Sequence, residues 1–349
     1  MRPVAVVAFV QTEHSAEDQG IAETEMVLPV ITEIKERTGL SRFGFTCSGS
    51  CDYLQGAPFA FVSALDTLGA WPPISESHVE MDGAWALYEA WVKLQIGEID
   101  TALVYGFGKS SQGDLRAIMS QQLDPYHLAP LGVDQVSMAA MQARAYMEKA
   151  GVKEDDLRAV AARSREAGRG NPFALHLPDP AESAAEQEYD VAPLHGYDVA
   201  PVTDGAAAIV LAAGDKAREL CERPAWITGI DHRTEPHSLG VRDLTRSEAA
   251  RVAGEKAGAT GIEVAELHAQ FSHEELILRE ALGLGDGVTI NPSGGALSAN
   301  PVMAAGLIRI GEAASRIHDG TASRTLGHAA SGPCLQQNLV CVLSGENNG

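Results

Sequence analysis

Short apolar runs recur along the chain, each long enough for a buried strand but too short for a helix. The runs span residues 4–10, 101–106, 206–212, 225–230, 264–271 and 338–343. Between them lie segments with apolar residues every three or four positions, the spacing of one helix face. These segments span residues 26–37, 83–96, 137–150, 154–166, 248–257, 274–282 and 301–317. The alternation predicts an α/β fold with a buried, largely parallel sheet.

The succession of strand and helix patterns occurs twice, which indicates two similar halves. The first half closes with the apolar run after Asp204, and the second opens at Pro224 after a helical linker. We place the boundary near Leu220, which gives halves of residues 1–220 and 221–349. Residues 122–203 carry several proline turn signals and no strong strand pattern. We expect this stretch to be a loop-rich insertion over the first half, where a ligand could be covered.

The composition is that of a globular protein, with 45% hydrophobic and 21% charged residues among 349. The formal net charge of -21 argues against a general binder of nucleic acid or anionic membranes, because both are polyanions. An anionic ligand would need a local basic or helix-terminal site. No apolar stretch approaches the roughly 20 residues of a membrane span, and the first residues show no cleavage site of a signal peptide. We therefore expect a cytoplasmic protein.

Five cysteines suit free thiols in a reducing compartment better than a disulfide framework. Cys47 and Cys51 lie four residues apart, but no second ligand pair stands at zinc spacing, and an apparent strand over residues 43–46 precedes them. We expect both to be structural, and we find no metal site in the sequence.

Two polar motifs in the second half are candidates for chemistry. His268 follows an apolar strand pattern, and the carboxyl edge of a parallel sheet usually presents ligand-binding groups. The glycine-rich turn at residues 291–301 contains Ser293, Gly294 and Gly295, whose small size permits close backbone approach to a ligand. Pro301 suits the first turn of the following helix.

A third candidate segment, residues 326–334, is expected to be a small-residue loop before the last strand. It offers His328 and Cys334 as reactive groups. The Cys334 thiol could become a thiolate if a nearby cation lowered its pKa.

Several segments, in the same order along the chain, resemble the sterol-carrier-type thiolases of the thiolase superfamily. The matching segments are residues 161–164, 171–174, 198–208, 266–283 and 291–306. Residues 266–283 resemble the His-Asp-Cys-Phe segment of that family and the helix that follows it. Residues 291–306 resemble its Asn-Pro-Ser-Gly-Gly to Gly-His-Pro segment. The resemblance covers nearly the whole length. It implies a thiolase fold, a five-layered αβαβα arrangement of two similar halves, in at least a dimer.

The departures from the family concern its reactive residues. Glu80 stands where the nucleophilic cysteine opens a buried helix, Gln270 replaces the cysteine of His-Asp-Cys-Phe, and Asn300 replaces the histidine of Gly-His-Pro. Only His268 of that set is kept, so Claisen exchange by the two-cysteine route is not expected. Glu80 is either a base or an ordinary charge at the start of the helix, beside Asp82 as its capping candidate.

The resemblance is greatest to lipid-transfer-protein relatives of bacterial steroid catabolism, one of which forms a side-chain retro-aldolase with an OB-fold and zinc-ribbon partner. It implies carbon-carbon cleavage of a steroid or lipid acyl-CoA, with CoA as part of the substrate and no cofactor of the chain's own. His268 would polarise the thioester carbonyl with help from Asn300, while Glu80, His328 or a tyrosine moves the proton. The expected substrate contacts are Gln270, Ser293, Gly294, Gly295 and Cys334.

Two alternatives stay open. One is a non-catalytic subunit that supports another thiolase-like chain, as in the cysteine-free chain-length factors that accompany ketosynthases. The other is a thiolase with Cys334 as a displaced nucleophile, although Cys334 follows a proline in a loop and does not open a helix. The first alternative predicts that bulky side chains fill the space around His268, Asn300 and Glu80. A catalytic chain predicts that these three residues converge on one open pocket.

Overall fold

The computed structural model describes residues 2–56, 58–69, 75–182 and 188–346. The first half contains the strands β1 (Val4–Gln11), β2 (Phe45–Gly49), β3 (Glu76–Val79), β4 (Thr101–Gly108) and β7 (Gly205–Ala213). Its helices are α1 (Glu23–Thr38), α2 (Asp52–Gln55), α3 (Val62–Leu68), α4 (Gly83–Gln95), α5 (Leu115–Ser120), α6 (Gln135–Ala150), α7 (Glu154–Gly168) and α8 (Gly214–Leu220). A small separate hairpin pairs β5 (Tyr189–Val191) with β6 (Leu194–His195).

The second half contributes the strands β8 (Ala225–Thr234), β9 (Val264–Glu266), β10 (Thr289–Ile290), β11 (Arg324–Ser331) and β12 (Gln337–Ser344). Its helices are α9 (Glu248–Ala257), α10 (Ser272–Ala281) and α11 (Ala305–His318).

The two halves have one topology. The strand order across the first half is β3-β2-β4-β7-β1, and across the second it is β10-β9-β11-β12-β8. In each half the first three strands of that order run parallel to one another and the other two pair antiparallel. Pairing of β1 with β8, where Ala5 faces Trp226, joins the halves into one ten-stranded sheet. The repeat agrees with the expected two similar halves, while the boundary near Leu220 stays a prediction.

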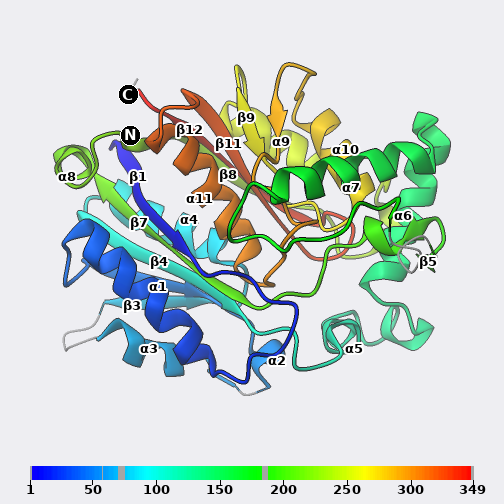
Figure 1. The fold of residues 1–349 in the computed structure, drawn as a ribbon, viewed down its shortest axis with the longest axis horizontal. Coiled ribbons are helices and arrows are strands. Elements are labelled where there is room, and N and C mark those ends of the chain that lie inside the picture. Colours follow the sequence, from blue (N-terminus) through cyan, green and yellow to red (C-terminus); the bar gives the residue numbers. More distant parts are fainter. Residues whose placement is uncertain (1, 57, 70–74, 183–187, 347–349) are drawn as a thin grey trace.

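Helices and sheets form five layers (Figure 1). The central layer consists of α4 and α11, whose apolar residues pack between the two halves of the sheet. Helix α1 covers the outer face of the first half together with α3 and α8, and α9 and α10 cover the outer face of the second. Because α4 and α11 lie between the two halves of the sheet, most of their residues are buried.

Local sequence explains where several helices begin and end. The Asp82, Asp134 and Ser247 side chains accept a backbone N–H at the start of α4, α6 and α9. Helices α1 and α6 end at Gly39 and Gly151, both in the left-handed conformation that glycine adopts without strain.

Several expectations need correction. The sheet is mixed, because β7 and β12 return antiparallel beside their neighbours in each half. The segment expected as a loop at residues 326–334 is mostly β11, since pairing with both β9 and β12 extends it. The strand expected over residues 264–271 ends at Glu266, and Pro301 precedes α11 by a turn. The stretch 122–203, expected to be loop-rich, contains α6 and α7, the two helices that the patterns over residues 137–150 and 154–166 predicted.

Candidate active site

The cavity and its walls

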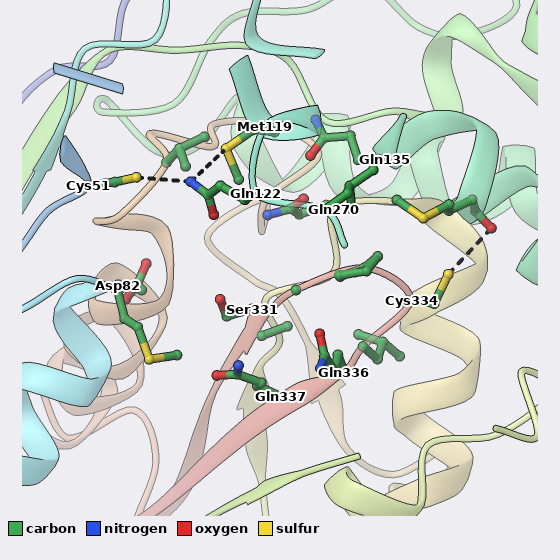
Figure 2. A pocket seen from close by; sticks show the side chains of 18 of the residues that line it. Cys51, Asp82, Met119, Gln122, Gln135, Gln270, Ser331, Cys334, Gln336 and Gln337 are labelled. Atoms are coloured by element: carbon green, nitrogen blue, oxygen red, sulfur yellow. Dashed lines mark hydrogen bonds between the residues drawn. The ribbon is translucent and has the colours of Figure 1, made fainter. Parts of the chain in front are cut away.

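A cavity of about 680 Å³ lies where the two halves meet, close to the starts of α4 and α10. The first half lines it with the turn before α4, with α2 and with the α5–α6 region. The second half lines it with the segment between β9 and α10, the loop before α11 and the loop after β11. Figure 2 shows Asp82 on one side of this space and Cys334 on the other, with Gln270 between them.

Among the predicted residues, His268, Gln270, Asn300, Glu80 and Cys334 line this one cavity. Folding brings them together from segments that lie far apart in the sequence.

His268 and Asn300

His268 lies two residues beyond β9 and is almost fully buried. Its Nδ1 accepts the Ala330 backbone N–H at 3.3 Å, so in the neutral ring the proton is on Nε2. That Nε2–H donates to Asn300 Oδ1 at 3.2 Å. Burial lowers the pKa of His268 to about 4. At neutral pH the residue is therefore an uncharged hydrogen-bond donor at the cavity wall.

Asn300 holds this donor in place. Asn300 is itself buried, and its backbone N–H donates to Thr203 Oγ1 at 2.9 Å. The side-chain amide of Gln270 lies 3.4 Å from His268 Nε2. A ligand carbonyl that entered here would meet a preorganised set of neutral polar groups.

Glu274

Glu274, in the first turn of α10, is a site residue that we did not predict. It is buried, it lines the cavity, and its Oε2 accepts the Gln270 backbone N–H at 2.9 Å. Burial raises the pKa of this carboxyl to about 7, against the opposing effect of the backbone N–H groups of Gln270 and Phe271. A group with this pKa can both accept and release a proton at neutral pH. In the sequence, Glu274 looks like an ordinary acidic residue of a first helical turn.

Glu80 and Asp82

Glu80 does not open helix α4, because the helix begins three residues later. Its half-exposed carboxylate accepts the Asp52 backbone N–H at 2.6 Å and lies 3.3 Å from His78 Nε2. The expectation of a helix-stabilised Glu80 is therefore wrong. The residue at the start of α4 is Asp82, the predicted capping candidate.

Asp82 caps both central helices. Its Oδ1 accepts N–H groups of Ala84 in α4 and Leu307 in α11, at 2.8 and 2.9 Å, and its Oδ2 accepts that of Gly306 at 2.8 Å. The Gly83 N–H donates to Met303 O at 2.9 Å beside it. The starts of α4 and α11 are thus held together through one buried carboxylate.

The cysteines

The thiols of the chain are not activated. All five cysteines are free, and burial raises the pKa of each of them. For Cys334 the pKa is raised to about 12, and its Sγ–H donates to Met138 O at 3.4 Å. Cys51, which also lines the cavity, accepts the Gln122 Nε2–H at 3.1 Å (Figure 2). Neither cavity cysteine is a thiolate at neutral pH, which argues against Cys334 as a displaced nucleophile.

Predicted residues outside the cavity

His328 is fully buried in β11, pairs with Asn338 Oδ1 through Nε2 at 3.0 Å, and does not line the cavity. Burial lowers the pKa of its ring to about 3. It therefore cannot reach a substrate in this cavity, contrary to our expectation. Successive side chains of a strand point to opposite faces of the sheet, so His328 and its neighbour Ala329 in β11 lie on opposite faces.

Ser293, Gly294 and Gly295 also lie away from the cavity, contrary to the predicted substrate contacts. Ser293 Oγ donates to Glu266 Oε2 at 2.6 Å, and Arg309 Nη1 pairs with the same oxygen at 2.9 Å. The two glycines pack closely against neighbouring residues, with positive φ angles of 98° and 62°. This turn supports a buried ion pair beneath β9 and leaves no room for a ligand.

No group of three His, Cys, Asp or Glu residues within the described ranges could hold a metal ion. In the same part of the chain, no helix is both long and apolar enough to span a membrane.

Similarity to known proteins

No protein-family model matches the chain. The acetyl-CoA acetyltransferase of Methanocaldococcus jannaschii is 29% identical over 278 residues, which cover 69% of this chain and 70% of that protein. The benzoylsuccinyl-CoA thiolase subunit BbsB of Thauera aromatica is 25% identical over 276 residues, 70% of this chain and 71% of that protein. Human sterol carrier protein 2 is 28% identical over 301 residues, 74% of this chain and 54% of that protein.

Solved structures agree over nearly the full length. An Ltp2-ChsH2(DUF35) aldolase superposes with a TM-score of 0.81 at 20% identity, covering 99% of this chain and 98% of that one. Human mitochondrial 3-ketoacyl-CoA thiolase superposes with a TM-score of 0.78 at 15% identity, covering 98% of both chains.

The five-layered α/β fold is the thiolase fold. The homologues of the chain are proteins of the thiolase superfamily.

Proposed function

We propose that this protein cleaves a carbon-carbon bond of a β-hydroxyacyl-CoA thioester in a retro-aldol reaction. The proposal rests above all on one observation: a buried, neutral His268 donor and a Glu274 carboxyl with a pKa of about 7 line the same cavity. The names of the relatives and structural neighbours, which include an acetyl-CoA acetyltransferase and an aldolase, support a CoA thioester and this type of bond cleavage.

In the proposed reaction Glu274 accepts the proton of the β-hydroxyl group. The electron pair of the O–H bond forms the new carbonyl as the bond between the α and β carbons breaks. The electron pair of that bond moves to the thioester and gives an enolate, whose oxygen replaces Asn300 Oδ1 as the acceptor of the His268 Nε2–H. Protonation of the α carbon by Glu274 then releases the shortened acyl-CoA and an aldehyde or ketone. CoA is part of the substrate, and the chain needs no cofactor of its own for these steps.

A cysteine nucleophile is not part of the proposal. The resemblance implies that Glu80 stands where the thiolases have their nucleophilic cysteine, and a carboxylate would give only a labile anhydride as acyl carrier. Glu80 is left to face the cavity as a charged, half-exposed wall residue. Together with the raised pKa of both cavity thiols, this favours non-covalent cleavage over Claisen exchange.

The open cavity weighs against a purely supporting subunit, in which bulky side chains would fill the space around His268, Asn300 and Glu80. We propose that the chain works in a hetero-oligomer with another thiolase-like chain, an OB-fold zinc-ribbon protein, or both. The structural neighbour named Ltp2-ChsH2(DUF35) aldolase combines Ltp2 with a DUF35 protein, which supports such a partner. A steroid or lipid acyl group and a cytoplasmic location remain part of the proposal.

The test is an assay of the purified protein, alone and with co-purified partners, against β-hydroxyacyl-CoA thioesters of steroid and fatty acids. We expect His268→Ala to lower kcat/KM by about 10²–10³-fold and Glu274→Gln by about 10²–10⁴-fold. His176→Ala, an exposed histidine outside the cavity, is the control. Cleavage that neither substitution changes would make the chain a supporting subunit, and no cleavage in any mixture would refute the proposal.

The pH profile adds a second measurement. Since Glu274 must be ionised to accept the proton, kcat/KM of the wild-type protein should rise with pH through a midpoint near 7. The residual activity of Glu274→Gln should lack this step. A wild-type profile that is flat between pH 5 and 8 would remove Glu274 from the role of base.

A further inference from the structure

We infer that the cavity selects acyl groups that carry no charge. This inference rests on the proposed CoA-thioester function and adds a specificity to it. Among the described residues that line the cavity there are three carboxylates, those of Glu80, Asp82 and Glu274, and neither a lysine nor an arginine. The whole chain is strongly acidic as well, with a net charge of -21.

The positive backbone groups around the cavity are already occupied by these same carboxylates. Asp82 accepts N–H groups at the starts of both α4 and α11. Glu274 accepts the Gln270 N–H just before α10, and Glu80 accepts the Asp52 N–H. Helix starts are the usual backbone sites for a ligand anion. Here the protein fills them with its own side chains.

Two arginines lie behind the cavity wall and bind other groups there. Arg309 is buried and pairs with Glu266 beneath β9. Arg242 lies behind the loop after β11 and donates to the backbone carbonyls of Pro333, at 3.0 Å, and Cys334. A carboxylate in the cavity would lose part of its hydration and would meet no lysine or arginine among the described lining residues, which is unfavourable.

Neutral polar groups take the place of cations in the wall. Six glutamines line the cavity: Gln121, Gln122, Gln135, Gln270, Gln336 and Gln337. Figure 2 shows several of them around the open space. Their amides can donate to and accept from hydroxyl and keto groups. Four methionines, Met81, Met119, Met138 and Met303, add flexible apolar surface that adapts to irregular shapes. This lining suits a bulky apolar acyl group with neutral oxygen substituents.

The test compares the binding of two ligands that cannot undergo retro-aldol cleavage. Decanoyl-CoA and the mono-CoA thioester of decanedioic acid share the CoA moiety and differ by a terminal carboxylate. Isothermal titration calorimetry on the purified protein, with its partner chain where one co-purifies, should show decanoyl-CoA binding at least about tenfold more tightly. Equal binding, or tighter binding of the carboxylate, would overturn the inference and leave the proposed cleavage standing. Binding of neither ligand would overturn the CoA-thioester function itself.

Two variants locate the effect in the cavity. Gln337→Lys adds a cation to the wall and should reduce the difference between the ligands to about threefold or less. Glu80→Gln removes one carboxylate from the wall. It should also reduce the difference in affinity between the two ligands, but by a smaller factor than Gln337→Lys. Gln19→Lys, on an exposed residue outside the cavity, is the control for net charge and should leave the difference unchanged. If Gln19→Lys changes the difference in affinity as much as Gln337→Lys does, the selection does not originate in the cavity.

Discussion

The two halves share one topology but use it differently at the strand ends that meet in the middle. In the first half β2 ends at Gly49, where an added Cβ would lie 2.4 Å from Gly83 N. Only glycine allows that approach between β2 and the start of α4. The corresponding strand of the second half, β9, ends at Glu266, which forms a buried ion pair with Arg309. The first half uses this position for close packing, and the second uses it for a polar network.

The connections to the central helices differ in the same way. Residues 80–82 alone join β3 to α4, whereas residues 291–304 join β10 to α11. The longer connection carries Asn300, which pairs with His268, and Asn291, whose Oδ1 accepts the Leu267 backbone N–H at 2.6 Å. Buried hydrogen bonds thus preorganise the second half for chemistry, while the first half contributes more exposed wall residues such as Tyr53. In the proposed reaction both reacting side chains, His268 and Glu274, therefore come from the second half.

The largest expected effect comes from breaking the ion pair of the second half. Arg309→Met leaves the Glu266 carboxylate buried without its partner, and we expect it to lower the free energy of unfolding by about 3–5 kcal/mol. Urea unfolding followed by circular dichroism measures this change. Arg158→Met removes a surface ion pair with Asp155 and is the matched control, with a change within about 0.5 kcal/mol.

A second variant, Arg309→Met with Glu266→Gln, sharpens the interpretation. This double variant removes the unpaired charge of Glu266, so it should recover part of the free energy of unfolding that Arg309→Met loses. If the double variant is no more stable than Arg309→Met, the cost lies in packing and not in the buried charge.

Asp82 connects the two halves, and its loss comes next in size. Asp82→Ala leaves three buried N–H groups at the starts of α4 and α11 without an acceptor. We expect a decrease of about 2–4 kcal/mol in the free energy of unfolding. Ser247→Ala, which removes a cap from α9 alone, should cost about 1 kcal/mol in the same experiment. Equal losses in the two variants would show that Asp82 serves only α4.

The smallest effect concerns the two glutamates of the cavity and depends on pH. Burial raises the pKa of Glu274 to about 7, so between about pH 4.5 and 7 the folded state keeps a proton that the unfolded state releases. The stability that this protonated group confers is therefore lost as the pH rises through that window. Glu274→Gln should match the wild type at pH 4.5 and exceed its stability by roughly 2 kcal/mol at pH 8.

Glu80→Gln is the comparison from the first half. Its carboxylate is half exposed, so the difference from the wild type should stay within about 0.5 kcal/mol at both pH values. Urea unfolding at pH 4.5 and 8 measures all three proteins. A pH-dependent difference for Glu80→Gln as large as that of Glu274→Gln would contradict the contrast between the two halves.

Most of the fold could be predicted from the sequence, because the period of apolar residues records which face of a strand or helix is buried. The pattern at residues 248–257 predicts α9 with its observed bounds. Strands β3 and β10 were missed because four and two residues are too few to show a period. The small residues of β11 resemble a loop in the sequence, and only pairing with β9 and β12 makes them a strand.

The site could be predicted only in part. His268, Asn300, Gln270, Glu80 and Cys334 do line one cavity, as their motifs suggested. His328 has the same side-chain chemistry as His268, but it points into the sheet packing and pairs with Asn338. The motif shows the type of residue at each strand end, and the pleat of the strand decides which face that residue reaches.

The sequence alone was enough to predict the α/β class and the repeated order of strands and helices. The tertiary structure alone decided that Glu274 has a pKa near 7 and that Asp82 holds α11 as well as α4. The physical reason is the range of the interactions. Periodicity and capping depend on residues within one or two turns, whereas desolvation and buried hydrogen bonds depend on neighbours that only folding brings together, such as Asp82 and Leu307.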